Sequence, residues 1–243
     1  MKAAGPRADW IWKRRFRTGL PRSPGSGKKW PAAWLPAGQR AALERNLGDL
    51  RTAETFNGDR PESFVNLALL EERRGNVAAA LAQYEAATRY APWFLPAYVN
   101  LAELQRQGGN EVVAEQTLRR ALAEAPGDAG VLYALGLSVY RQQRPGEAVA
   151  LLAEAAANGP EVARYPFAYA LALESQGKLV EALKVIDAAR MRHPDDRDLL
   201  DAGLNIARKA GDMGRAREYV RQLLRLSPAD PGLVQLAAEL GVQ

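Results

Sequence analysis

Residues 95–128 read LPAYVNLAELQRQGGNEVVAEQTLRRALAEAPGD. The segment contains two stretches with helical spacing of apolar residues, joined at Gly109 and closed by Pro126. Proline and alanine keep a 34-residue interval through the chain, at Pro92, Pro126, Pro160, Pro194 and Pro228 and at Ala80, Ala114, Ala148, Ala182 and Ala216. A fixed period of this length is typical of stacked helical units, so the sequence predicts an array of helix pairs.

We number the residues of each unit so that its closing proline is position 32. Small residues then recur at positions 8, 20 and 27, where they would let two antiparallel helices approach closely. Position 20 holds the five alanines, position 8 holds Ala68, Ala102, Gly136, Ala170 and Leu204, and position 27 holds Ala87, Ala121, Ala155, Ala189 and Leu223. Position 15 is glycine in four units, which suits a left-handed turn between the helices, but Gln143 in the third. In the fifth unit Gly203 and Leu204 occupy positions 7 and 8, so we expect looser packing there.

This spacing resembles the tetratricopeptide repeat family over about 168 of the 243 residues. The resemblance implies an all-α fold, a right-handed superhelical solenoid of antiparallel helix pairs. It divides residues 61–228 into five repeats by their 34-residue period, 61–94, 95–128, 129–162, 163–196 and 197–230. It also implies a non-catalytic scaffold that binds a protein or peptide, with the first helix of each pair lining a concave groove.

In this family the side chains at positions 2, 5, 6, 9, 12 and 13 face the ligand. The groove residues that this mapping predicts are Asn66, Leu69, Asn100, Arg106, Tyr133, Leu137, Tyr140, Arg141, Phe167, Leu171 and Glu174. Asn66 and Asn100 can each pair an amide donor and an acceptor with a peptide backbone. The middle of the groove is apolar and is edged by Arg141, Arg164 and Glu174. Alternatively, some of these apolar side chains turn inward or are covered by the chain's own N-terminal arm.

One known ligand class of the family, the acidic tails of chaperones, is not supported. Its carboxylate clamp needs Lys and Asn at positions 5 and 9, Asn at position 6 of the next unit, and Lys and Arg at positions 2 and 6 of the third. The corresponding residues here are Val65, Leu69, Asn100, Gly130 and Ala134. Only Asn100 matches.

The segments outside the repeats differ from them in composition. Residues 1–40 hold ten Lys or Arg and one acidic residue, and residues 1–36 contain four of the five tryptophans. We expect 1–36 to be a mostly disordered basic arm; an anionic partner for it, or its origin in a longer precursor, are the alternatives. We further expect an N-terminal helix over 37–56 and a C-terminal capping helix and tail over 231–243.

A narrower resemblance concerns the entry to the array. Residues 39–43 (QRAAL) and 57–62 (NGDRPE) are similar to the tetratricopeptide tails of exported multihaem cytochrome-like proteins. Because the chain has no cysteine, no haem ligand can be assigned. This resemblance implies an array that belongs to a longer exported parent, which would place it in the periplasm.

The chain has few of the side chains that usually act in catalysis or metal binding. The absence of cysteine excludes disulfides, thiolate metal sites and a cysteine nucleophile, and His193 is the only histidine. We interpret His193 as a solvated turn residue and predict no catalytic residues, metal site or cofactor. The sequence has neither a long apolar run nor a signal-peptide core after Met1, so a soluble cytoplasmic protein is the default expectation.

Two functional hypotheses follow. In the first, the array is an interaction scaffold that holds a peptide or protein segment in its groove. In the second, it is a peripheral adaptor, anchored to a membrane or nucleic acid by residues 1–36, because clustered basic and aromatic side chains suit phosphate-rich surfaces. The oligomeric state and the identity of the partner do not follow from the sequence.

Overall fold

The computed structural model describes residues 37–56 and 60–242 of the chain. The predictions made for residues 1–36 lie outside this part. The chain divides into two compact units, Met1–Thr52 and Ala53–Gln243. The long helix α2 (Ala37–Phe56) begins in the first unit, and the helices from Pro61 onward all belong to the second.

The second unit consists of helix pairs and a final single helix. The first helices of the pairs are α3 (Pro61–Arg74), α5 (Leu95–Gln107), α7 (Ala129–Arg141), α9 (Arg164–Ser175) and α11 (Arg197–Lys209). The second helices are α4 (Val77–Tyr90), α6 (Glu111–Glu124), α8 (Pro145–Asn158), α10 (Leu179–Arg190) and α12 (Met213–Leu226), and α13 (Pro231–Glu239) follows. Throughout the described residues every regular element is a helix, which confirms the all-α prediction.

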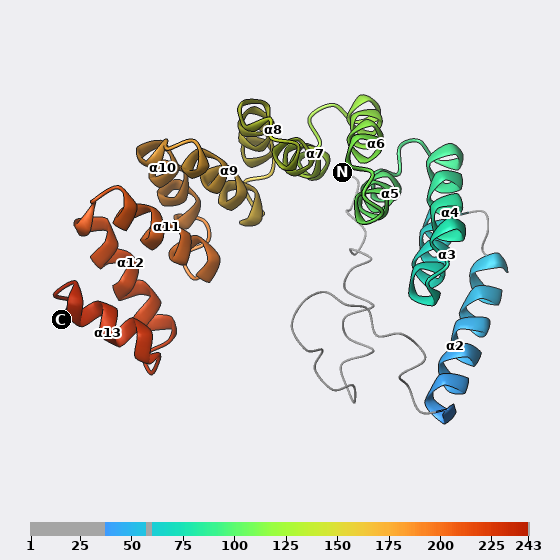
Figure 1. The fold of residues 1–243 in the computed structure, drawn as a ribbon, viewed down its shortest axis with the longest axis horizontal. Coiled ribbons are helices and arrows are strands. Elements are labelled where there is room, and N and C mark those ends of the chain that lie inside the picture. Colours follow the sequence, from blue (N-terminus) through green and yellow to red (C-terminus); the bar gives the residue numbers. More distant parts are fainter. Residues whose placement is uncertain (1–36, 57–59, 243) are drawn as a thin grey trace, which may run out of the picture. The chain divides into compact units, whose positions relative to one another are not determined.

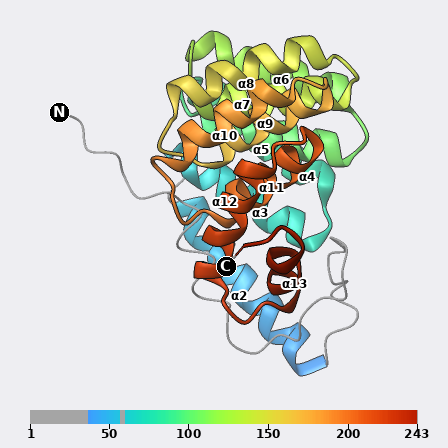
Figure 2. The ribbon, with the colours of Figure 1, turned by 90° about the vertical axis from the view of Figure 1, so that its left-hand side faces the viewer.

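The helices of this unit form two layers. Each first helix packs against its own second helix, and each first helix also contacts the first helix of the next pair. Consecutive second helices make at most weak contacts with one another among the described elements. Because the first helices lie closer together, they form the inner side of the curved array, as Figure 1 shows for α5, α7 and α9 beneath α6, α8 and α10. Seen from the side in Figure 2, successive helices stack along the array.

The turn inside each pair repeats with the 34-residue period. Position 15 has a positive φ in all five repeats, at Gly75 (81°), Gly109 (82°), Gln143 (61°), Gly177 (73°) and Gly211 (72°). The next backbone N–H then donates to the carbonyl five residues earlier, for example Asn76 N to Glu71 O at 2.9 Å. This left-handed C-terminal cap satisfies helix carbonyls that would otherwise lack a donor. The third repeat makes the same turn without glycine, and its equivalent bond, Arg144 N to Val139 O, is 3.2 Å.

Replacing Gln143 with glycine should stabilise the protein. A side chain in the left-handed region clashes with its own backbone, whereas glycine adopts this conformation freely, so we expect a gain of about 0.5–1 kcal/mol in the free energy of unfolding. The matched control is Gly177→Gln at the same position of the fourth repeat, where nothing lies within 4 Å of an added Cβ, so only the backbone cost applies. Urea unfolding of the three proteins measures both effects. Equal stability of all three would contradict the assignment of strain to Gln143.

The predicted small positions form the centre of each helix pair. The alanines at position 20 are at most 2% exposed, and the residues at positions 8 and 27 are buried as well. At Gly136 an added Cβ would lie 2.8 Å from Cγ of Leu152, closer than real Cβ atoms come to their neighbours. A small residue is therefore required at Gly136 because the facing helix α8 occupies the space.

The prediction of looser packing in the fifth repeat is wrong. An added Cβ at Gly203 would lie 2.4 Å from Cζ of Tyr219, whose side chain is 1% exposed. The Tyr219 hydroxyl donates to Asp187 in the preceding repeat at 2.6 Å. The tyrosine ring on α12 thus takes the volume that a large residue at position 7 fills in the other repeats.

The turns between repeats are joined by side-chain hydrogen bonds. Asn158 donates to the carbonyl of Gly127 at 2.8 Å, and His193 Nε2 lies 2.9 Å from the carbonyl oxygen of Pro160. The interpretation of His193 as a solvated turn residue is therefore wrong, since its half-buried ring links two successive turns.

Candidate functional groove

Five large side chains on α7 and α9 lie on the inner layer of the array. We call Tyr133, Leu137, Tyr140, Phe167 and Leu171 the central patch. Tyr140 is 39% exposed and Leu171 is 37% exposed, and the other three are half-buried. The two helices contact each other directly. The sequence thus places on two neighbouring helices a set of apolar side chains that the core covers only in part.

The half-buried members of the central patch are held by the core beneath them. The Tyr133 ring packs at a tilt against the buried Tyr165 ring, with 5.1 Å between centroids. Leu137 packs against the cluster formed by Leu152, Ala168 and Ala172, and Phe167 packs against the large cluster of the last two repeats. These contacts hold the three half-buried side chains against the core.

Most charged residues beside the central patch already have partners. Arg141 Nη2 lies 2.8 Å from Glu111 Oε1 at the start of α6, and Glu174 pairs with Lys209 on α11. In the second repeat Arg106 pairs with Glu103 on its own helix, at 2.6 Å. Arg141 and Glu174 therefore link their helices to neighbouring ones, and all three groove residues have an ion-pair partner.

Arg164 differs from these residues. It is the first residue of α9, is exposed, and places its guanidinium carbon 5.6 Å from the Tyr133 centroid and 5.4 Å from the Tyr165 centroid. Such distances are within the range of cation–π attraction. The sequence indicated Arg164 as an edge of the patch, but the stacking on two tyrosines depends on the fold.

The predicted polar positions lie toward the N-terminal end of the array. Asn66 on α3, Leu69 on the same helix and Asn100 on α5 are all half-buried. Glu72, also on α3, accepts a hydrogen bond from the buried hydroxyl of Tyr84 at 2.6 Å. Burial and this carboxylate raise the pKa of Tyr84, so the phenol stays neutral. The two asparagines thus lie on the neighbouring inner helices α3 and α5.

An ion-pair network that the sequence did not indicate joins the second and third repeats. Glu115 on α6 is 7% exposed and accepts hydrogen bonds from Arg119, Arg144 and Gln142, at 2.8, 2.8 and 2.7 Å. Arg119 and Arg144 also bind Glu147. Burial by itself would raise the pKa of the Glu115 carboxyl, but the hydrogen bonds from these three residues outweigh it and hold the pKa below its ordinary value of 4.5.

This network predicts a specific pH dependence of stability. Because the pKa of Glu115 is lower in the folded than in the unfolded chain, its contribution is fully present above pH 4.5 and is lost as the pH falls through the folded value. Glu115→Gln should therefore be less stable than the wild type near neutral pH, and the difference should shrink in acid. Urea unfolding of both proteins over a pH series measures it. Carboxylates that do not share Arg119 or Arg144 titrate alike in both proteins and cancel. A difference independent of pH would contradict the assignment.

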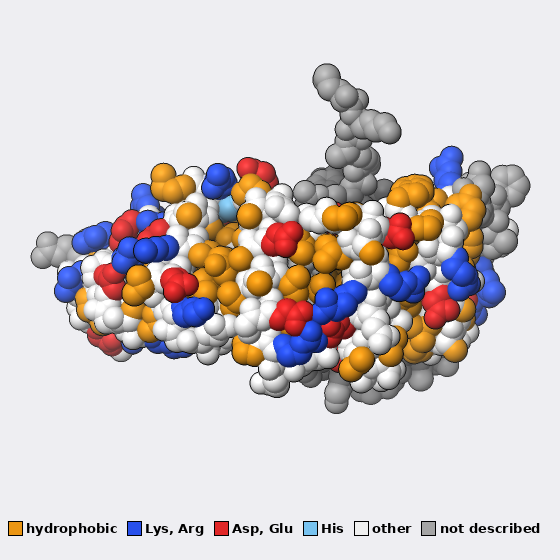
Figure 3. All heavy atoms as spheres, turned by 90° about the horizontal axis from the view of Figure 1, so that it is seen from above, with side chains coloured by type: hydrophobic (Ala, Val, Ile, Leu, Met, Phe, Trp, Pro, Cys, Tyr) orange, Lys and Arg blue, Asp and Glu red, His pale blue; other side chains and the backbone are white. Residues whose placement is uncertain are grey.

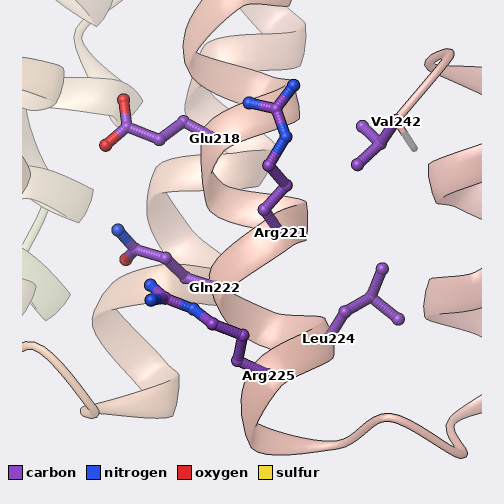
Figure 4. A pocket seen from close by; sticks show the side chains of 6 residues that line it. All are labelled: Glu218, Arg221, Gln222, Leu224, Arg225 and Val242. Carbon is purple, nitrogen blue, oxygen red and sulfur yellow. The ribbon is translucent and has the colours of Figure 1, made fainter.

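Two other surfaces of the array have a pocket or exposed apolar side chains. A shallow pocket lies at the C-terminal end and is lined by Glu218, Arg221, Gln222, Leu224, Arg225 and Val242. In Figure 4, Leu224 extends toward the side on which Val242 lies, while Glu218, Gln222 and Arg225 extend to the other side of α12. Figure 3 views the outer face and shows apolar side chains gathered over its middle, with charged side chains among them and toward both ends. The exposed apolar side chains of the outer helices include Val112, Val113 and Val180.

No arrangement of titratable groups in the described ranges 37–56 and 60–242 suggests a metal site, since no three His, Asp or Glu side chains are grouped to hold an ion. Within the same residues, no helix is both long and apolar enough to cross a membrane.

The stacked pairs and their partly exposed inner layer define a helical-repeat protein with an extended surface. Two family models, both described as Tetratricopeptide repeat, match residues 73–137 and 133–197, which together span about half of the chain. The chain belongs to the tetratricopeptide repeat family. Proteins of this family are in general non-catalytic scaffolds that bind proteins or peptides, and the fold supports such a role.

Individual relatives agree with this assignment. A TPR repeat-containing protein of Pseudomonas aeruginosa is 28% identical over 175 residues, which cover 70% of this chain and 29% of that protein. The chain therefore spans less than a third of the length of this curated relative. The likeness to cytochrome-like proteins has no counterpart in these findings and stays a prediction.

Solved structures share the fold at low sequence identity. PilF of Pseudomonas aeruginosa is 20% identical with a TM-score of 0.60, over 83% of this chain and 91% of that one. YrrB, described as a TPR protein with an unusual peptide-binding site, is 20% identical with a TM-score of 0.56, over 78% and 97% of the two chains. MamA is 17% identical with a TM-score of 0.55, over 64% and 91%.

Proposed function

We propose that the chain holds a peptide or protein segment in the groove of its first helices, with the central patch as the main contact. The observation that carries this proposal is the partial exposure of five large apolar side chains on α7 and α9 beside charges that are mostly neutralised. Contiguous exposed apolar area on a monomer commonly marks an interaction site. Because the core holds Tyr133, Leu137 and Phe167 in place, binding would cost little conformational entropy at these three side chains.

The N-terminal part of the groove suits the backbone of the same segment. Asn66 and Asn100 lie at equivalent positions of α3 and α5, one repeat apart, and first helices of successive repeats are in contact. A side-chain amide offers both a donor and an acceptor to an extended chain. In this proposal the asparagines orient the segment and the central patch provides most of the affinity. Support also comes from YrrB, whose description names a peptide-binding site on the same fold.

Selection of short displayed peptides against the full chain tests the proposal. We expect selected peptides rich in large apolar residues that bind with one-to-one stoichiometry in fluorescence anisotropy titrations. Failure to select any binding peptide, with a folded protein verified by circular dichroism, would overturn it. The alternative of an adaptor anchored through residues 1–36 stays a prediction of the sequence, because those residues lie outside the described part.

A further inference from the structure

Arg164 differs from the other basic residues near the central patch in its interactions. Its guanidinium lies over the rings of Tyr133 and Tyr165, and in the described part of the chain it makes no ion pair with a carboxylate. By contrast, Arg106 and Arg141 each pair with a glutamate, and the Lys209 ammonium pairs with Glu174. Arg164 therefore brings to the edge of the central patch a positive charge that forms no ion pair among the described residues.

The stacking leaves Arg164 ready for an anion. A guanidinium is planar and carries its N–H donors in that plane, so rings that contact its face do not use these donors. A carboxylate accepts two such hydrogen bonds in parallel, and these charge-assisted bonds are stronger than neutral ones. Packing against two tyrosines also restricts the long arginine side chain before any ligand arrives, so less conformational entropy is lost on binding.

We propose that the segment bound by the groove carries a carboxylate beside its apolar residues, and that this carboxylate pairs with Arg164. The inference rests on the proposed function, since it uses the same groove. The apolar side chains of the segment cover the central patch, and the carboxylate lies at the N-terminal end of α9. Charge complementarity thus selects acidic-apolar segments over neutral or basic ones.

An array of synthetic peptides with a Leu- and Phe-rich core provides the test. One set carries a single Asp at successive places next to the core, and the matched set carries Asn; both are amidated at the C-terminus. A third set carries Asn and a free C-terminal carboxylate, which distinguishes a terminal carboxylate from a side chain. For the full chain we expect binding to the best carboxylate-bearing peptide to be about five- to tenfold tighter than to its neutral counterpart.

Two variants assign this preference to a residue. Arg164→Gln should bind the charged and neutral peptides equally, whereas Arg221→Gln should keep the preference. Arg221 is an exposed residue of the outer helix α12 in the last pair, so this control removes the same charge from the other layer of the array. Thermal melting followed by circular dichroism verifies that both variants are folded.

The outcomes separate this inference from the proposed function. Equal binding of charged and neutral peptides by the wild type, or a preference that persists in Arg164→Gln, overturns the role of Arg164. If neutral peptides still bind and their binding is lost in Tyr133→Ala/Phe167→Ala, the groove function stands without the charge selection. Absence of binding to every peptide in the array counts against both.

Discussion

Gly203→Leu should lower the free energy of unfolding by about 3 kcal/mol, the upper end of the usual range for an overpacked core. Even the Cβ atom would lie 2.4–2.9 Å from three atoms of the Tyr219 ring. The ring cannot move away easily, because it is 1% exposed and its hydroxyl is bonded to Asp187. Arg190 also lies over the ring, with its guanidinium carbon 5.0 Å from the centroid. Urea unfolding followed by circular dichroism measures the loss.

A double-mutant cycle controls this prediction. Tyr219→Leu alone should cost several kcal/mol by leaving a cavity, as truncations of large aromatic side chains do. Gly203→Leu/Tyr219→Leu reproduces the leucines that the third repeat has at the same two positions, Leu135 and Leu151. We expect the double variant to be more stable than the sum of the single losses by about 1 kcal/mol or more, since the two side chains compete for one volume. Additive losses would contradict that account.

Tyr133→Ala/Phe167→Ala should weaken the binding of a selected peptide by about 30-fold or more, which corresponds to about 2 kcal/mol. Aromatic side chains at the centre of an interface commonly supply much of its energy, and these two lie on neighbouring inner helices. Both rings are half-buried, so the double variant will also lose some folding stability. Isothermal titration at a temperature where every variant is folded measures the affinity.

Leu135→Ala is the matched control for this variant. Leu135 lies on the same helix as Tyr133 but is fully buried, so its truncation should cost about 2–5 kcal/mol of folding stability. In the folded protein it should leave peptide affinity nearly unchanged. The opposite pattern, with affinity intact in the aromatic variant and stability lost as heavily as in Leu135→Ala, would place the aromatic side chains in the core and the binding site elsewhere.

The fold was predictable because backbone requirements repeat in the sequence. Glycine is favoured where the turn inside a pair takes a positive φ, and small residues are favoured where two helices approach closely, so both recur at the 34-residue interval. The space between the two helices of a pair can nevertheless be filled by a large side chain from either helix. The exchange of sizes between Gly203 and Tyr219 could not be read from position 7 alone, because the two residues meet only in the folded pair.

For the candidate site, the sequence pattern predicted only where the apolar side chains lie, and their role in binding stays a proposal. The spacing of Tyr133, Leu137 and Tyr140 places them on one helix, and their shared surface follows from the inner layer. Charge pairing depends instead on side chains from different repeats, such as Arg141 with Glu111 or Glu174 with Lys209. The sequence pattern does not distinguish these ion-paired residues from Arg164. The guanidinium of Arg164 lies over two tyrosine rings instead.

The central claim is that a partner binds on the inner helices. Its most direct test is photo-cross-linking of a selected peptide that carries a benzophenone group, followed by mass-spectrometric identification of the modified residues. The account predicts modification within α5, α7 and α9, and its loss when excess unlabelled peptide competes. Competable modification confined to the outer helices α6, α8 and α10, where Val112 and Val180 are exposed, would contradict it.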